Sequence, residues 1–189
     1  MGFAALFSSL ALLASDPATA ALTQADAPAA QAPVSTGTDP ATQANADAIA
    51  AGQDPFPTGA PTDDYGLMAW CYGALSGHLS LYDKMMPEVR RIEGEFPDSK
   101  TPLAKTMDGY RVQHEEGRKI LAHYGRALDI EEATGKTGGL GRTEAVSRGK
   151  DAWKGSDTAD PRQVAQLWMS WALPDRCQST AAKIAPRGG

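Results

Sequence analysis

Hydrophobic residues recur at alternating steps of three and four along two long stretches of the chain, which is the spacing of a buried stripe on an α-helix. The first stretch follows Asp64, and its stripe comprises Cys71, Ala74, His78, Tyr82, Met85, Val89, Ile92 and Phe96. Asp63 or Asp64 supplies an N-cap for this helix. Pro87 lies within the stretch and lacks a backbone N–H, so we expect a kink there rather than a clean end.

The second stretch follows a turn at residues 97–100, and Thr101 and Pro102 fit the cap and the first position of its helix. Its stripe comprises Leu103, Met107, Tyr110, His114, Gly117, Leu121, Tyr124 and Leu128. Gly135 is a natural residue to end it. Two helices of similar length joined by a short turn predict an antiparallel hairpin.

Two weaker helical segments complete the pattern. A short helix is expected over residues 143–154, and a better-marked one begins after Asp160, where Pro161 and Gln163 complete a capping-box arrangement. Pro174 bends or restarts this last helix. No stretch alternates with a period of two, so no sheet is expected. The fold class is therefore all-α: an antiparallel helical hairpin extended to a four-helix bundle-like domain over residues 64–189.

The first third of the chain has a different composition. The apolar run Phe3–Ala14 and the small residues Ala18, Thr19 and Ala20 predict a secretory signal peptide over residues 1–20. Residues 21–63 are rich in Ala and Pro and poor in large apolar side chains, which predicts a disordered tether in which residues 45–52 form at most a transient helical turn. The apolar run Phe3–Ala14 is too short to span a membrane, so we expect no membrane span after signal cleavage.

Charge is divided along the same boundary. All 18 Lys and Arg residues follow Tyr65, together with most of the 23 Asp and Glu residues. The helical part is therefore close to neutral and has no run of basic residues. Nucleic-acid binding and anionic-lipid binding require clustered positive charge, which this part of the chain lacks. We therefore expect no nucleic-acid partner.

The chain has two cysteines, Cys71 and Cys177. In an exported protein two cysteines favour one disulfide, and there is no Cys-x-x-Cys motif to indicate a redox or metal-binding pair. If the third helix returns along the hairpin and the fourth comes back, Cys177 reaches the end of the first helix that carries Cys71. We therefore predict a Cys71–Cys177 disulfide.

Candidate ligand-binding residues lie on the two stripes of the hairpin: His78, Met85, Met107 and His114. Imidazole and thioether groups can bind haem or a metal ion, although buried methionine is more often adaptable core filler. In a hairpin whose turn is centred near residue 99, position 78 faces about position 120, so His114 lies roughly 9 Å out of register. No motif for covalent haem or for a di-iron site is present, and no metal or cofactor is assigned.

No constellation of residues predicts catalysis, so we expect no enzymatic activity and assign no catalytic residue. The expected function is that of an exported, periplasmic or secreted helical protein that acts by protein–protein contact, as an accessory or inhibitor-like module on an envelope partner. The alternative is a helical bundle that binds a small ligand, haem or a metal ion through His78, Met85, Met107 and His114.

Overall fold

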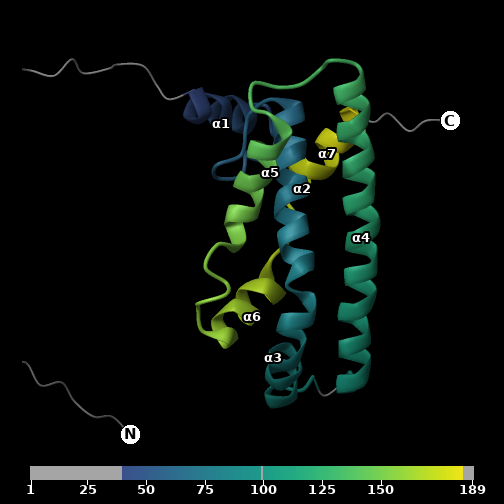
Figure 1. Ribbon diagram of the computed structural model, residues 1–189. Coiled ribbons are helices and arrows are strands. Elements are labelled where there is room, and N and C mark those ends of the chain that lie inside the picture. Colours follow the sequence, from purple (N-terminus) through teal and green to yellow (C-terminus); the bar gives the residue numbers. More distant parts are fainter. Residues whose placement is uncertain (1–39, 99, 185–189) are drawn as a thin grey trace, which may run out of the picture. The chain divides into compact units, whose positions relative to one another are not determined.

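A computed structural model describes residues 40–98 and 100–184 of the chain (Figure 1). The signal peptide predicted over residues 1–20 lies outside this part, as do residues 21–39 of the predicted tether. The described residues contain helices and no strands, so the all-α prediction is confirmed. The helices are α1 (Pro40–Ala50), α2 (Asp64–Ser80), α3 (Tyr82–Glu95), α4 (Leu103–Ala133), α5 (Arg142–Lys150), the 3₁₀ turn η1 (Asp151–Trp153), α6 (Pro161–Ser170) and α7 (Asp175–Ile184).

The first predicted helix is divided into α2 and α3 at Leu81 rather than at Pro87. Asp63 caps α2, its carboxylate accepting a hydrogen bond from the backbone N–H of Gly66. At the other end, the Ser80 hydroxyl donates to the carbonyl of Gly77, which an unbroken helix would offer to Leu81. Leu81 instead donates to the carbonyl of His78. Pro87 lies inside α3, so the helix is interrupted six residues before the proline at which a kink was expected, and the interruption coincides with a local side-chain hydrogen bond.

The second predicted helix is confirmed as α4. It begins one residue later than expected, with Pro102 rather than Thr101 at the N-cap position. At its end Gly135 has a φ of +72°, and the N–H groups of Gly135 and Lys136 bond to the carbonyls of Glu132 and Glu131. This is the glycine-ended helix terminus that the sequence indicates.

Helix α4 runs antiparallel to α2 and α3. The Tyr65 hydroxyl at the start of α2 donates to Glu132 at the end of α4, with an O···O distance of 2.5 Å. At the opposite end, the Tyr110 hydroxyl donates to Glu93 over 2.6 Å. These two hydrogen-bonded pairs have the register expected of a hairpin whose turn is centred near residue 99.

Helix α5 packs against α2 in the same direction, and this is the most extensive contact between two helices in the described part of the chain. Gly73 lies against the backbone of Val146, and Gly149 lies against the backbone carbonyl of Trp70. Farther along, Gly77 lies against the indole of Trp153 in η1. Because these glycines have no side chain, α5 and η1 approach α2 closely enough for backbone atoms to contact other backbone atoms or, at Gly77, an indole ring.

Helices α6 and α7 return antiparallel to α2 and α3. Asp160 caps α6 by accepting from the N–H groups of Arg162 and Gln163, as the sequence predicts. The chain is non-helical from Trp171 to Pro174 and resumes as α7. There Cys177 forms a disulfide with Cys71, and both residues are 0% exposed. The predicted disulfide is confirmed.

The four-helix bundle-like arrangement is not confirmed. Contacts centre on α2, which packs against α4, α5 and α7, whereas α6 packs against α3 (Figure 1). The buried apolar residues accordingly form two clusters. One surrounds α2 and the disulfide, and the other joins α3 and α6 through Met85, Val89, Val164 and Trp168.

Helical structure also begins earlier than residue 64, where the sequence places the start of the helical domain. Helix α1 occupies residues that the sequence assigns to the tether, and the loop after it is held to α7 by Arg176, whose side chain contacts Asp54 and Phe56. Arg176 lies more than 100 residues away along the chain, a contact that local composition does not reveal. No helix in the described part of the chain combines the length and apolarity needed to cross a bilayer.

Candidate functional site

Aromatic side chains from η1, from α6 and from the segment after α6 surround His78 in the last turn of α2. Its ring stacks between the indoles of Trp168 and Trp171, with both centroid distances 4.6 Å, and Trp153 lies 5.3 Å away. Trp153 and Trp168 also donate their indole N–H groups to the carbonyls of Ala74 and His78, each over 2.9 Å. Two tryptophans therefore fix the end of α2 through hydrogen bonds as well as through packing.

His78 is uncharged at neutral pH in this environment. Burial, with a smaller electrostatic contribution from the neighbouring His114, lowers its pKa from 6.5 to about 4. Its Nδ1 atom is buried and has no hydrogen-bond partner among the described residues. The imidazole is therefore a neutral ring with a buried nitrogen that lacks a hydrogen-bond partner.

The other three candidate ligand residues lie near this cluster. His114 of α4 stacks on Tyr82 with a centroid distance of 4.1 Å, and Tyr82 in turn contacts Trp168. Met85 is 2% exposed in the core between α3 and α6. Met107 packs on the same core from α4. Within residues 40–98 and 100–184, no group of three His, Cys, Asp or Glu side chains could hold a metal ion, and binding of a ligand by these four residues stays a hypothesis.

A groove of about 740 Å³ runs between α3 and α4 beside the aromatic cluster. Each helix contributes residues at steps of three, four and seven, which is one face of an α-helix. Its lining residues are Tyr82, Asp83, Met86, Pro87, Arg90, Ala104, Met107, Asp108 and Arg111. Tyr82 and Met107 lie on the predicted hydrophobic stripes, whereas the charged lining residues do not belong to a hydrophobic pattern, and only their helical spacing groups them on this face.

The groove combines an apolar floor with unpaired polar groups. Met86, Met107 and Tyr82 are partly buried, whereas Asp83 and Arg90 are exposed and form no ion pair in the described structure. Pro87 has no N–H to donate to the carbonyl of Asp83, four residues earlier, so this acceptor loses its usual helical partner. The groove therefore offers a cation, an anion and a backbone acceptor around flexible thioethers.

The positive charge of Arg111 is compensated by carboxylates within α4. Its guanidinium pairs with Asp108 over 2.8 Å and with Glu115 over 2.6 Å. Mutual pairing at positions three and four apart on one helix leaves little net field on that side of the groove. Arg90 and Asp83, on α3, are thus the charged groups available to an incoming molecule.

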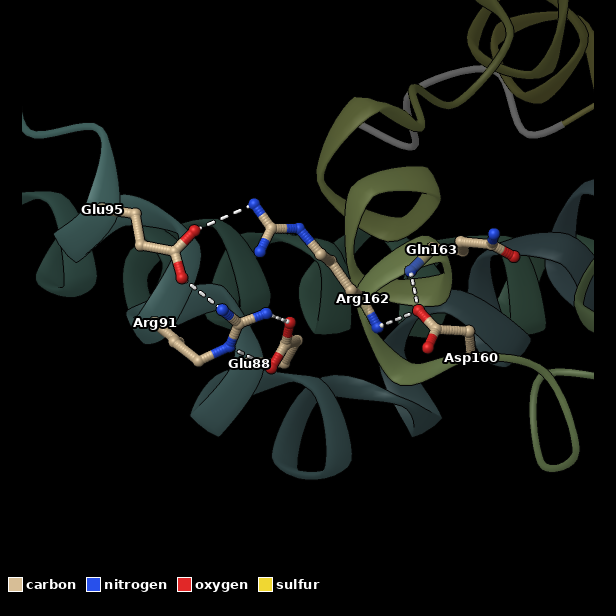
Figure 2. Close-up of polar contacts among 6 residues, drawn as sticks. All are labelled: Glu88, Arg91, Glu95, Asp160, Arg162 and Gln163. Carbon is tan, nitrogen blue, oxygen red and sulfur yellow. Dashed lines mark hydrogen bonds and ion pairs between the residues drawn. The ribbon is translucent and has the colours of Figure 1, made fainter.

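The opposite face of α3 is fixed to α6 by a chain of charged side chains (Figure 2). Arg91 pairs with both Glu88 and Glu95 on α3, and the second carboxylate oxygen of Glu95 accepts from Arg162 of α6 over 2.9 Å. Arg162 follows the capping residue Asp160, so the start of α6 is anchored at this point. Helix α6 packs on α3 through residues such as Met85, Val89 and Trp168, none of which lines the groove.

No protein-family model, curated protein or solved structure matches the chain. The candidate site thus consists of a neutral histidine within an aromatic cluster and, beside it, an open groove with unpaired charges.

Proposed function

We propose that this is an exported, non-enzymatic helical protein that binds a segment of an envelope protein in the groove between α3 and α4, as an accessory or inhibitor-like module. The observation that carries the proposal is the groove itself, about 740 Å³ and lined by facing stripes of two helices. Its open form suits a polypeptide segment better than a small molecule, since small-molecule sites enclose most of the ligand surface.

The lining chemistry supports this choice. Methionine side chains such as Met86 and Met107 adapt to different apolar partners, and they are common on surfaces that bind peptides. Arg90 and Asp83 lie seven residues apart and carry opposite charges without ion-pair partners. A segment with a central apolar side chain, flanked by one acidic and one basic residue, would complement all of these groups.

Export is supported by the disulfide. Disulfides persist in oxidising compartments such as the periplasm and the extracellular space, and they are rare in the cytosol. The Cys71–Cys177 bond is fully buried and joins two helices of the core. The bond therefore supports a periplasmic or extracellular location for the proposed module.

The proposal is tested by site-specific photo-crosslinking in the native envelope. A photoreactive residue at Ala104 in the groove should capture one defined protein, whereas the same residue at Ala122, elsewhere on α4, should not. The captured protein should then bind the purified chain. Arg90→Glu should weaken that binding at least tenfold and Arg118→Glu, an exposed arginine outside the groove, should leave it unchanged. Equal binding by both variants would refute the groove as the contact surface.

A second candidate function is binding of a small ligand, haem or a metal ion through His78, Met85, Met107 and His114. It is favoured by the buried Nδ1 atom of His78, which has no partner and lies within an aromatic cluster. Absorption spectra and metal analysis of protein drawn gently from its native envelope test this candidate. A colourless, metal-free protein would eliminate the haem and metal versions.

A further inference from the structure

Arg176, in the first turn of α7, is a charged side chain buried in the described part of the chain. The residue is 9% exposed. Arginine is seldom buried to this degree without a carboxylate partner, because its charge cannot be removed by deprotonation and must be compensated where it lies.

Arg176 has no such partner. Its Nε atom donates to the backbone carbonyl of Asp54 over 2.6 Å, and its guanidinium lies 4.0 Å from the ring centroid of Phe56. Its Nη2 atom makes a long contact of 3.4 Å with the side-chain oxygen of Gln53. No carboxylate of the described residues forms an ion pair with it, so a carbonyl, an amide and an aromatic ring supply only part of the compensation.

A small cavity of about 280 Å³ adjoins this arginine, between α7 and the loop that follows α1. Asp175, Ser179 and Lys183 follow one face of α7 at steps of four, and residues of the loop close the other side. The lining residues are Gly52, Gln53, Asp54, Asp175, Arg176, Ser179 and Lys183. The cavity thus has two cationic and two anionic side chains in its wall.

These charges do not neutralise one another. Neither Asp54 nor Asp175 forms an ion pair in the described structure, and Lys183 has only a long contact of 3.5 Å with Asp64, which lies outside the lining. A simple anion would be attracted by Arg176 but repelled by the two carboxylates, and a simple cation would be attracted by the carboxylates but repelled by Arg176. Only a molecule that carries both a positive and a negative charge complements the cationic and the anionic side chains together.

We propose that this cavity binds a free α-amino acid, whose carboxylate is held by Arg176 with Lys183 and whose ammonium group is held by Asp54 and Asp175. The planar guanidinium matches a carboxylate in geometry as well as in charge. A cavity of this size accommodates a small side chain. The inference is independent of the α3–α4 groove, which shares no lining residue with this cavity.

Isothermal titration calorimetry of the full, oxidised chain tests the inference with five probes: glycine, L-alanine, L-serine, propionate and ethylamine. At least one of the three amino acids should bind, with an affinity at least tenfold higher than that of propionate, which lacks the ammonium group, or of ethylamine, which lacks the carboxylate. Failure of all three amino acids at millimolar concentration would overturn the inference. Propionate binding as tightly as L-alanine would also overturn it, because the cavity would then be a plain anion site.

Variants separate the two halves of the site. Asp175→Asn should weaken amino-acid binding at least fivefold and leave any propionate binding unchanged or stronger. Asp151→Asn, at an exposed aspartate outside the cavity, is the matched control and should have no effect. Arg176→Gln should abolish binding, and because it also releases the loop after α1, Lys183→Gln is the gentler variant, expected to reduce binding at least threefold. Unchanged binding in Asp175→Asn and Lys183→Gln together would refute the site.

Discussion

At the scale of single residues, His78 shows how packing overrides ordinary side-chain chemistry. Its sequence position suits a ligand, yet its ring is stacked between two indoles and its backbone carbonyl accepts from one of them. Burying a positive charge at this position costs more free energy than interactions with neighbouring groups recover, so the imidazole stays neutral. The same residue is therefore both part of the core and a polar group without a partner.

His78 makes stability depend on pH. Its pKa is about 4 in the folded protein and near 6.5 when exposed, so the unfolded chain takes up the proton first. The stability this provides is complete above pH 6.5 and is lost as the pH falls from 6.5 through 4. We expect His78→Phe, which keeps an aromatic ring, to lose less stability than the unmodified protein across this interval, measured by urea unfolding. Parallel pH profiles for the two proteins would contradict the assignment, and His123→Phe, at an exposed histidine, is the control.

At the scale of helices, the α2–α5 contact depends on glycine. A Cβ atom on Gly73 would overlap the carbonyl oxygen of Val146, and one on Gly149 would overlap the carbonyl oxygen of Trp70. Both obstacles are backbone atoms, which cannot rotate away as side chains do. Close helix approach of this kind outweighs the low helix propensity of glycine.

We therefore expect Gly73→Ala and Gly149→Ala each to lower the free energy of unfolding by about 1–3 kcal/mol, as overpacking does. Gly109→Ala on α4 is the matched control, because its Cβ would meet no atom within 4 Å. There the better helix propensity of alanine should raise stability by about 0.5–1 kcal/mol. Chemical denaturation measures all three, and a stabilising effect at Gly73 or Gly149 would mean that the helices are not in contact as described.

The helices illustrate which features the sequence reveals. Asp63, Asp160 and Gly135 act on residues within a few positions of themselves, so local patterns predicted the caps and ends that they form. The break at Leu81 escaped prediction because it depends on one hydroxyl, that of Ser80, competing for a backbone carbonyl. The hydrophobic stripe likewise found the core but not the α3–α4 groove or the Arg176 cavity, because each has four charged lining residues and its two sides meet only through tertiary packing.

At the scale of the whole molecule, the disulfide connects elements that the chain order keeps far apart. Cys71 and Cys177 are separated by 106 positions, and the bond holds α7 against α2. Helix α7 has ten residues, too few to persist alone in water. Through Arg176, α7 also holds the loop after α1. One covalent bond thus supports both α7 and the loop after α1.

Replacing both cysteines, as Cys71→Ala with Cys177→Ala, should lower the free energy of unfolding by about 2–5 kcal/mol under oxidising conditions, the usual range for a bond that closes a long loop. The unmodified protein refolded with dithiothreitol should unfold at the same urea concentration as the variant, which the reductant should not affect. Hydrogen exchange should rise most in α7 and in residues 53–56, because their contacts depend on the position of α7. Equal stability of variant and oxidised protein would show that packing alone holds α7. Exchange that rises evenly over all helices would instead mean that α7 and the loop do not form a unit held by this bond.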